Sequence, residues 1–194
     1  MTTPLRIKNY EIGSVHGRFQ PPHLGHFEYI HEAMNLCEFL WIGIARPDIR
    51  EYDPCEVAKH RADVANNPLT YFERITIIEK MLIESGKSRL QFGFVPFPID
   101  KPERLPDFLP TSVVCFTTIY DDWNRHKVAK LQMAGYKVEV LWERTDKLYA
   151  GQAIRDSMRA GTSDWESMVP PATARILKSL DLGKRLGQLS ASCE

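Results

Sequence analysis

Short apolar runs alternate with helix-length amphipathic stretches along this chain, and that alternation limits the possible folds more than any other feature. The runs with the length of buried strands are 11–16, 39–45, 89–97, 112–118 and 136–142. Strands that alternate with helices are typical of right-handed βαβ units. We therefore predict an α/β fold with a Rossmann-like, doubly wound parallel sheet, helices on both faces and a C-terminal helical tail.

The length of 194 residues indicates a single domain, 1–194, with a core at about 9–160 and a helical tail at about 164–187. The segment 70–86 is the clearest helix, because Thr70 and Glu73 form a capping-box pattern. Apolar residues from Leu24 to Cys37 recur at helical spacing and predict another helix.

Composition excludes several classes of protein. Lys plus Arg and Asp plus Glu each number 25, so the formal net charge is zero, and broad nonspecific binding of nucleic acid is not expected. No apolar stretch is long enough to span a membrane, and the N-terminus lacks the pattern of a signal peptide. The four cysteines have no zinc-ligand spacing, so we predict a cytoplasmic protein without its own metal ligands.

The decapeptide GRFQPPHLGH, residues 17–26, follows the first predicted strand and opens the first predicted helix. Gly17 lets the backbone approach a phosphate closely. His23 and His26 are three residues apart, so their side chains share one side of the first helical turn. The turn also offers unpaired N–H groups and the positive end of the helix dipole. Together these features predict a binding site for a polyphosphate.

This motif resembles the signature of the nucleotidylyltransferase superfamily that carries His-x-Gly-His. Within the superfamily, the chain is most similar to archaeal-type nicotinamide-nucleotide adenylyltransferases. Three further stretches carry the resemblance, namely NPLTYFER (67–74), GYKVEVLW (135–142) and AGQAIRDSMRAGTSDWESMVP (150–170). The resemblance implies direct in-line transfer of a nucleotidyl group, with release of pyrophosphate and no covalent enzyme intermediate.

The resemblance also implies roles for individual residues. His23, His26 and Arg155 would be catalytic, and Arg74 would brace the site. Mg²⁺ would be the cofactor, held mainly by the substrate phosphates. The predicted nucleotide-binding residues are Gly17, Arg18, Phe19, Gln20, Gly25, Phe116, Thr117, Gln152 and Ile154.

The chain departs from the adenylyltransferase pattern in its late motif, in the loop 98–110 and after the fourth predicted strand, where Phe116-Thr117-Thr118-Ile119 stands for Phe-Thr-Gly-Asn. The late family motif Ser-x-Thr-x-x-Arg is Ala150-Gly151-Gln152-Ala153-Ile154-Arg155 here, so two hydroxyls are absent. The loop 98–110 lacks the tryptophan that stacks on the pyridine ring in the family. A small anionic acceptor would need arginines rather than a stacking ring. The candidate acceptor-binding residues are Arg46, Phe108, Thr118, Tyr120 and Trp123.

Three functions follow as alternatives. The first is an adenylyltransferase that joins ATP to nicotinamide mononucleotide, and the second is a cytidylyltransferase that joins CTP to a small phospho- or phosphonate acceptor. The third is a nucleotide sensor without turnover. The partners would be a nucleoside triphosphate, a small anionic acceptor and possible further copies of the chain in a homo-oligomer. The loop 46–68 would be either a solvated loop or a lid.

Overall fold

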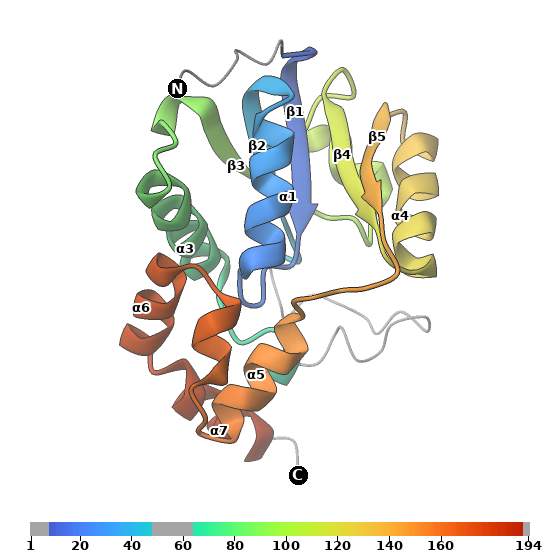
Figure 1. Ribbon diagram of the computed structural model, residues 1–194. Coiled ribbons are helices and arrows are strands. Elements are labelled where there is room, and N and C mark those ends of the chain that lie inside the picture. Colours follow the sequence, from blue (N-terminus) through green and yellow to red (C-terminus); the bar gives the residue numbers. More distant parts are fainter. Residues whose placement is uncertain (1–7, 48–63, 192–194) are drawn as a thin grey trace. The chain divides into compact units, whose positions relative to one another are not determined.

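A computed structural model describes residues 8–47 and 64–191, and its centre is one parallel sheet (Figure 1). The five strands lie in the order β3-β2-β1-β4-β5. Their bounds are Tyr10–Gly17 (β1), Cys37–Ala45 (β2), Phe92–Phe97 (β3), Val114–Ile119 (β4) and Val138–Glu143 (β5). This order is that of a Rossmann-like doubly wound sheet, so the predicted fold class is confirmed. Most of the region proposed as a loop or lid, 48–63, lies outside the described residues.

The helices fall between the strands and after them. Their bounds are Leu24–Met34 (α1), Tyr71–Glu84 (α3), Asp122–Met133 (α4), Gly151–Arg159 (α5), Pro171–Ser179 (α6) and Leu182–Ala191 (α7). The prediction that helical spacing reaches Cys37 is wrong, because α1 ends at Met34 and Cys37 begins β2. In the described part of the chain, no helix combines the length and apolar character needed to cross a membrane.

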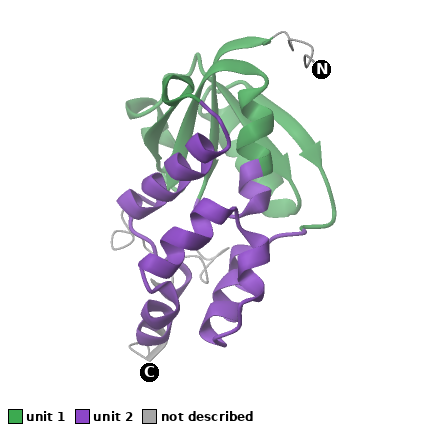
Figure 2. Cartoon of the chain, turned by 60° about the vertical axis from the view of Figure 1, so that its left-hand side comes forward, with its two compact units in different colours: residues 1–17, 28–45, 88–147 green, residues 18–27, 46–87, 148–194 purple. Residues whose placement is uncertain are grey.

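The chain divides into two compact units (Figure 2). We call residues 1–17, 28–45 and 88–147 the sheet unit, and residues 18–27, 46–87 and 148–194 the motif unit. The sheet unit contains all five strands, whereas the motif unit contains the His-x-Gly-His segment and the C-terminal helices. The single-domain organisation expected from the sequence stays a prediction.

Apolar packing holds the sheet unit together. Phe97, Cys115, Leu131 and Tyr136 belong to one buried cluster that joins the sheet to α4 and to the 3-10 turn Pro102–Asp107. In Figure 1 α1 crosses in front of β1 and β2, and its buried residues are Tyr29, Ile30, Ala33 and Met34. The register between β1 and β4 runs over Gly13–Val114 and Ser14–Cys115, in the middle of β1 and at the amino end of β4.

The motif unit has its own apolar cluster, in which Leu69, Ile77, Ile154 and Trp165 are all buried. The capping box predicted for α3 is present, because the Thr70 hydroxyl accepts a hydrogen bond from the Glu73 N–H and the Glu73 carboxylate accepts one from the Thr70 N–H. Glu73 also forms two 2.8 Å hydrogen bonds with Arg185 of α7. These bonds tie the last helix to the start of α3.

Candidate active site

His23 and His26 lie at the amino end of α1 with their rings stacked, at a centroid distance of 3.7 Å. His23 Nδ1 accepts a hydrogen bond from the backbone N–H of His26 (3.3 Å), so the His23 side chain caps the helix. Because Nδ1 is the acceptor, the proton of the neutral ring lies on Nε2. A Cβ atom at Gly25 would lie 3.2 Å from the His23 ring, so a glycine there leaves this ring its room. The arrangement provides an imidazole N–H donor of fixed orientation beside a helix N-terminus.

Arg155 lies on α5 and is 3% exposed. Its guanidinium donates hydrogen bonds to the backbone carbonyl of Gln20 (2.5 Å), to Oδ1 of Asn66 (2.9 Å) and to Oε1 of Gln152. These contacts connect α5 to the His-x-Gly-His loop within the motif unit. A Cβ atom at Gly151 would lie 2.7 Å from the Gln20 oxygen, so the first turn of α5 requires a glycine to approach this loop.

Gln20 holds the loop through its side chain. Its amide donates to the carbonyl of Leu69 (2.8 Å) and accepts from the Leu69 N–H (2.9 Å). This paired contact is the one a neighbouring strand would make, and it fixes the loop against the segment before α3. The hydrogen bonds of the Gln20 side-chain amide therefore go to the protein backbone.

Arg74 is fully buried, although it lies on an amphipathic helix. Its guanidinium donates to the carbonyls of Thr70 (3.2 Å), Arg18 (3.0 Å) and Arg46 (2.8 Å). Phe19, directly after Arg18, has a φ of 53°, and Arg46 has a φ of 51°. Left-handed backbone in residues other than glycine is costly and needs support from its surroundings. Arg74 gives this support through its bonds to the Arg18 and Arg46 carbonyls, and its role as a brace of the active site stays a prediction.

The remaining predicted residues of the motif unit have different environments. Phe19 is buried with its ring 4.8 Å from that of His26, measured between centroids. Arg46 is buried, at 5% exposure. Gln152 bonds Arg155 and donates to Asp156 (2.7 Å), so its amide positions the arginine. Ile154 packs its side chain into the apolar cluster.

The sheet unit holds the other predicted nucleotide-binding residues, Gly17, Phe116 and Thr117, in or at the ends of β1 and β4. Phe116 packs over Gly13, where a Cβ atom would lie 2.3 Å from its ring, and its carbonyl accepts a hydrogen bond from Tyr29. Thr117 is fully buried. The Phe116 side chain is therefore part of the core of the sheet unit.

The other candidate acceptor residues, Phe108, Thr118, Tyr120 and Trp123, also belong to the sheet unit. The Tyr120 hydroxyl accepts from Trp142 Nε1 (2.9 Å). Trp123 lies in the first turn of α4, with the ammonium of Lys130 5.6 Å from its ring centroid. Phe108 has the Arg104 guanidinium 5.9 Å from its ring centroid.

Two features were missed from the sequence. Asn66 orients Arg155, but nothing in its local sequence distinguishes it from a loop residue. His16 is 5% exposed, and its ring stacks on that of Phe97 at a centroid distance of 4.3 Å. A polar residue at the end of an apolar run was the available signal. Burial lowers the pKa of His16 well below its ordinary value, and the charge of Lys127 lowers it further.

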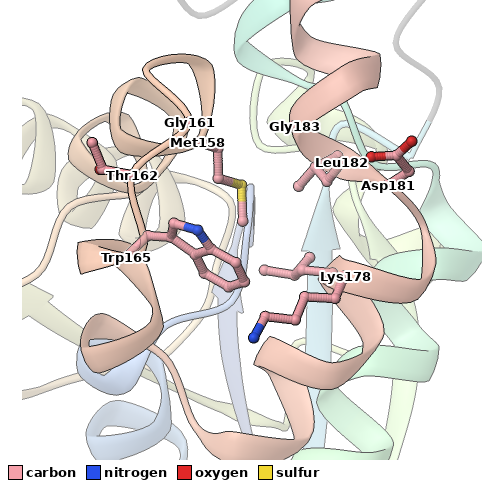
Figure 3. A pocket seen from close by; sticks show the side chains of 9 residues that line it. Met158, Gly161, Thr162, Trp165, Lys178, Asp181, Leu182 and Gly183 are labelled. Atoms are coloured by element: carbon pink, nitrogen blue, oxygen red, sulfur yellow. The ribbon is translucent and has the colours of Figure 1, made fainter.

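A pocket of about 270 Å³ lies elsewhere in the motif unit, where Trp165, Met158 and Leu182 face it (Figure 3). Lys178 and Asp181 line the same pocket (Figure 3). None of its lining residues is a predicted site residue. Among the described residues, no group of three or more His, Cys, Asp or Glu side chains is arranged to hold a metal ion.

Comparison with known proteins gives several related sequences. Residues 15–149 match the cytidylyltransferase-like family. The chain is 39% identical to a phosphonoformate cytidylyltransferase of Streptomyces viridochromogenes, over 90% of this chain and 94% of the relative. It is 31% identical to a nicotinamide-nucleotide adenylyltransferase of Archaeoglobus fulgidus, again over 90% of this chain and 94% of the relative.

Solved structures share the fold. A bifunctional NMN adenylyltransferase/ADP ribose pyrophosphatase from Francisella tularensis superposes with a TM-score of 0.62 at 14% identity, and covers 94% of this chain. This chain spans about half (54%) of that bifunctional protein. A protein from Vibrio parahaemolyticus that is described as a putative nicotinate-nucleotide adenylyltransferase gives a TM-score of 0.55 at 17% identity, over 91% of this chain and 96% of that one.

The predicted superfamily and the predicted reaction class, nucleotidyl transfer by an enzyme, are therefore confirmed. Relatives of both predicted kinds, cytidylyltransferase and adenylyltransferase, match the chain over most of its length. The chain belongs to the cytidylyltransferase-like family of nucleotidyltransferases.

Proposed function

We propose that this chain is a cytidylyltransferase that transfers CMP from CTP to a phosphonate oxygen of a small phosphonocarboxylate such as phosphonoformate. The observation that carries the proposal is the 39% identity with a phosphonoformate cytidylyltransferase along almost the whole of both chains. The loop 98–110 supports it, because it lacks an indole ring to stack on a pyridine.

The reaction would proceed in one displacement. A phosphonate oxygen of the acceptor attacks the α-phosphorus of CTP, and a new P–O bond forms there. The bond from the α-phosphorus to the bridging oxygen of the β-phosphate breaks, and pyrophosphate leaves with that electron pair. No covalent bond to the protein forms, so positioning and charge stabilisation supply the catalysis.

The His-x-Gly-His segment would act on the triphosphate. His23 would donate its Nε2 proton in a hydrogen bond to a phosphate oxygen, because His26 holds Nδ1 as an acceptor. Arg155 would contribute a guanidinium charge whose position is set by Gln20, Asn66 and Gln152. Arg18, Phe19 and Gly25 would line the nucleotide through their backbone, and Arg46 would add charge for the acceptor.

His23, His26 and Arg155 offer nitrogen donors that suit phosphate oxygens, whereas Mg²⁺ prefers oxygen ligands. Mg²⁺ would therefore enter with the triphosphate and be held by its oxygens and by water. Bound in that way, it would neutralise charge that accumulates on the leaving pyrophosphate.

A location in the cytoplasm is part of the proposal, and the buried free thiols of Cys37 and Cys115 suit a reducing compartment. Assembly into a homo-oligomer stays a prediction.

The second candidate function is adenylyl transfer from ATP to nicotinamide mononucleotide. The 31% identity with the Archaeoglobus enzyme favours it. The two candidates differ in both substrates, so one assay separates them.

The deciding experiment measures pyrophosphate release with Mg²⁺ in four arms, which pair CTP or ATP with phosphonoformate or nicotinamide mononucleotide. We expect turnover with CTP and phosphonoformate. Turnover confined to ATP and nicotinamide mononucleotide would replace the first proposal with the second. Absence of turnover in all four arms, with nucleotide binding retained, would favour the sensor.

A further inference from the structure

The hydroxyl of Tyr29 stands between β1 and β4 in the sheet unit. It donates a hydrogen bond to the carbonyl of Phe116 (2.6 Å) and accepts one from the N–H of His16 (3.3 Å). Burial raises the pKa of this phenol, so it remains a neutral donor. The register between the two strands ends at Ser14 and Cys115, two residues before His16 on β1 and one residue before Phe116 on β4. Tyr29 therefore bridges the strands where they separate, at the point where the strand order reverses and ligands bind in sheets of this kind.

The ring of His16 carries two buried nitrogen atoms next to the point where β1 and β4 separate. Neither of its ring nitrogens has a hydrogen-bond partner among the residues that the structure describes. Nitrogen atoms buried in this way are rare in folded proteins, and each one calls for an explanation such as a ligand.

Packing explains the ring at position 16 but not its nitrogens. Gly43 lies opposite His16 in the β1–β2 register, and a Cβ atom there would come within 2.6 Å of the Phe97 ring. Phe97 therefore lies over Gly43 and stacks on His16 with an angle of 4° between the ring planes. A phenylalanine at position 16 would make the same stack. The packing around position 16 therefore does not require the imidazole nitrogens.

The surroundings of His16 favour an anion. Lys127 of α4 is the charged group that acts on His16, and its charge also reaches Cys115 on β4. The Thr117 hydroxyl is buried and lies close enough to the Tyr29 phenol to affect its pKa. This part of the sheet therefore combines neutral N–H and O–H donors with a positive potential.

We propose that His16 recognises the acceptor, by donating a hydrogen bond from its neutral imidazole to the carboxylate of a phosphonocarboxylate that enters between β1 and β4. The inference rests on the proposed function and deepens it. One phosphonate oxygen of the acceptor becomes the nucleophile, so the carboxylate is the group left to distinguish this acceptor from a simple phosphonate. Lys127 supplies favourable charge without direct contact.

The test is the His16→Phe variant, which keeps the stacked ring and removes both nitrogens. We expect the KM for phosphonoformate to rise about 10- to 100-fold, as for the loss of a hydrogen bond to a charged group, with the KM for CTP unchanged. The preference for phosphonoformate over methylphosphonate, which lacks a carboxylate, should collapse. His16→Gln, which restores an N–H donor, should recover part of that preference. His31→Phe is the matched control, because His31 is a half-exposed residue of α1 outside the proposed sites.

A structural role for His16 predicts a different result. In that case His16→Phe would lower the melting temperature and leave the preference for phosphonoformate unchanged, and the proposal would be overturned. Binding measured by calorimetry distinguishes a failure of the proposed function from a failure of the role proposed for His16. If the wild-type protein shows no turnover but binds phosphonoformate more tightly than His16→Phe does, the proposed function fails and the role of His16 stands.

A second measurement does not depend on the variant folding. The ¹⁵N resonances of the His16 ring in the wild-type protein should shift when phosphonoformate is added, and should not shift with methylphosphonate. Equal shifts with both compounds, or none with either, would contradict the assignment.

Discussion

Each unit has a buried apolar cluster, but the motif unit adds buried guanidinium groups that bind backbone carbonyls. In the sheet unit, strand register and apolar packing set each position, and Phe97, Cys115 and Leu131 share one buried cluster. In the motif unit, buried guanidinium groups donate hydrogen bonds to backbone carbonyls, as Arg74 does to those of Arg18 and Arg46. Apolar packing tolerates changes that keep volume, whereas directional hydrogen bonds fail when one partner is removed. The residues proposed to bind the triphosphate, His23, His26 and Arg155, lie in the unit where such polar contacts add to the apolar packing.

The largest expected effect tests this contrast at Arg74. Arg74→Met should remove the guanidinium donor from the carbonyls of Arg18 and Arg46, and reduce the free energy of unfolding by about 4 kcal/mol. Amide exchange should accelerate in 18–27 and in α3, both in the motif unit, with β1 and β2 less affected. Arg74→Lys is the matched control and should lose less stability. Equal acceleration in both units would break the contrast.

His23→Ala tests chemistry rather than stability. Loss of an imidazole donor at a phosphate should lower kcat by about 10²- to 10³-fold, as for removal of an oxyanion-hole donor. The lost helix cap should cost about 1 kcal/mol of stability, so the variant should remain folded. Pyrophosphate release and a thermal melt check both parts, with His31→Ala as the control. A kcat within about threefold of wild type would contradict the role given to His23.

Two glycine substitutions sharpen the contrast in packing. Gly43→Ala should cost about 2 kcal/mol, because its Cβ atom would meet the Phe97 ring in the tightly packed sheet unit. Gly187→Ala in α7 meets nothing within 4 Å, so it should stabilise the protein by about 0.5–1 kcal/mol. Denaturant titration measures both changes. A loss of stability at Gly187 would show that the last helix is packed more tightly than the structure indicates.

The last expected effect is a pH dependence of stability that comes from His16. Because its pKa in the folded protein is depressed, the unfolded chain binds the proton more readily as the pH falls below about 6.5. Stability from this group is complete above that pH and is lost by up to about 1.4 kcal/mol per unit below it, until the folded pKa is reached. The positive charge that opposes protonation comes from Lys127. Thermal melts from pH 7 to 5 should therefore fall more steeply for wild type than for His16→Phe, and parallel curves would count against this account.

Local sequence patterns predicted much of the fold. The apolar runs located all five strands, and the capping-box pattern located the start of α3, because both signals lie within a few residues of the structure they cause. The helical periodicity of apolar residues continued to Cys37 and so predicted too long a helix. An apolar residue that begins a buried strand can fall at helical spacing by coincidence. For the run 89–97, the structure forms a 3-10 turn at Arg89–Gln91 before the strand begins.

The candidate site was predictable where its residues are adjacent in sequence. His23 and His26 are three residues apart, and their stacking follows from that spacing. The contact of Arg155 with Asn66 joins residues 89 positions apart, and the pairing of Gln20 with Leu69 joins residues 49 apart. No periodic signal encodes such contacts. The resemblance to a family, not the amphipathic pattern of α3, indicated that Arg74 is more than a surface charge.

The hydrogen bonds from Arg74 to backbone carbonyl oxygens have a consequence for the evolution of this chain. Every residue offers the same carbonyl, so Arg74 holds positions 18 and 46 without specifying which side chains they carry. The side chains at these two positions can change during evolution while the backbone conformation there is kept. A lineage can in this way explore new acceptors by small steps, because the geometry of transfer is inherited separately from the choice of substrate.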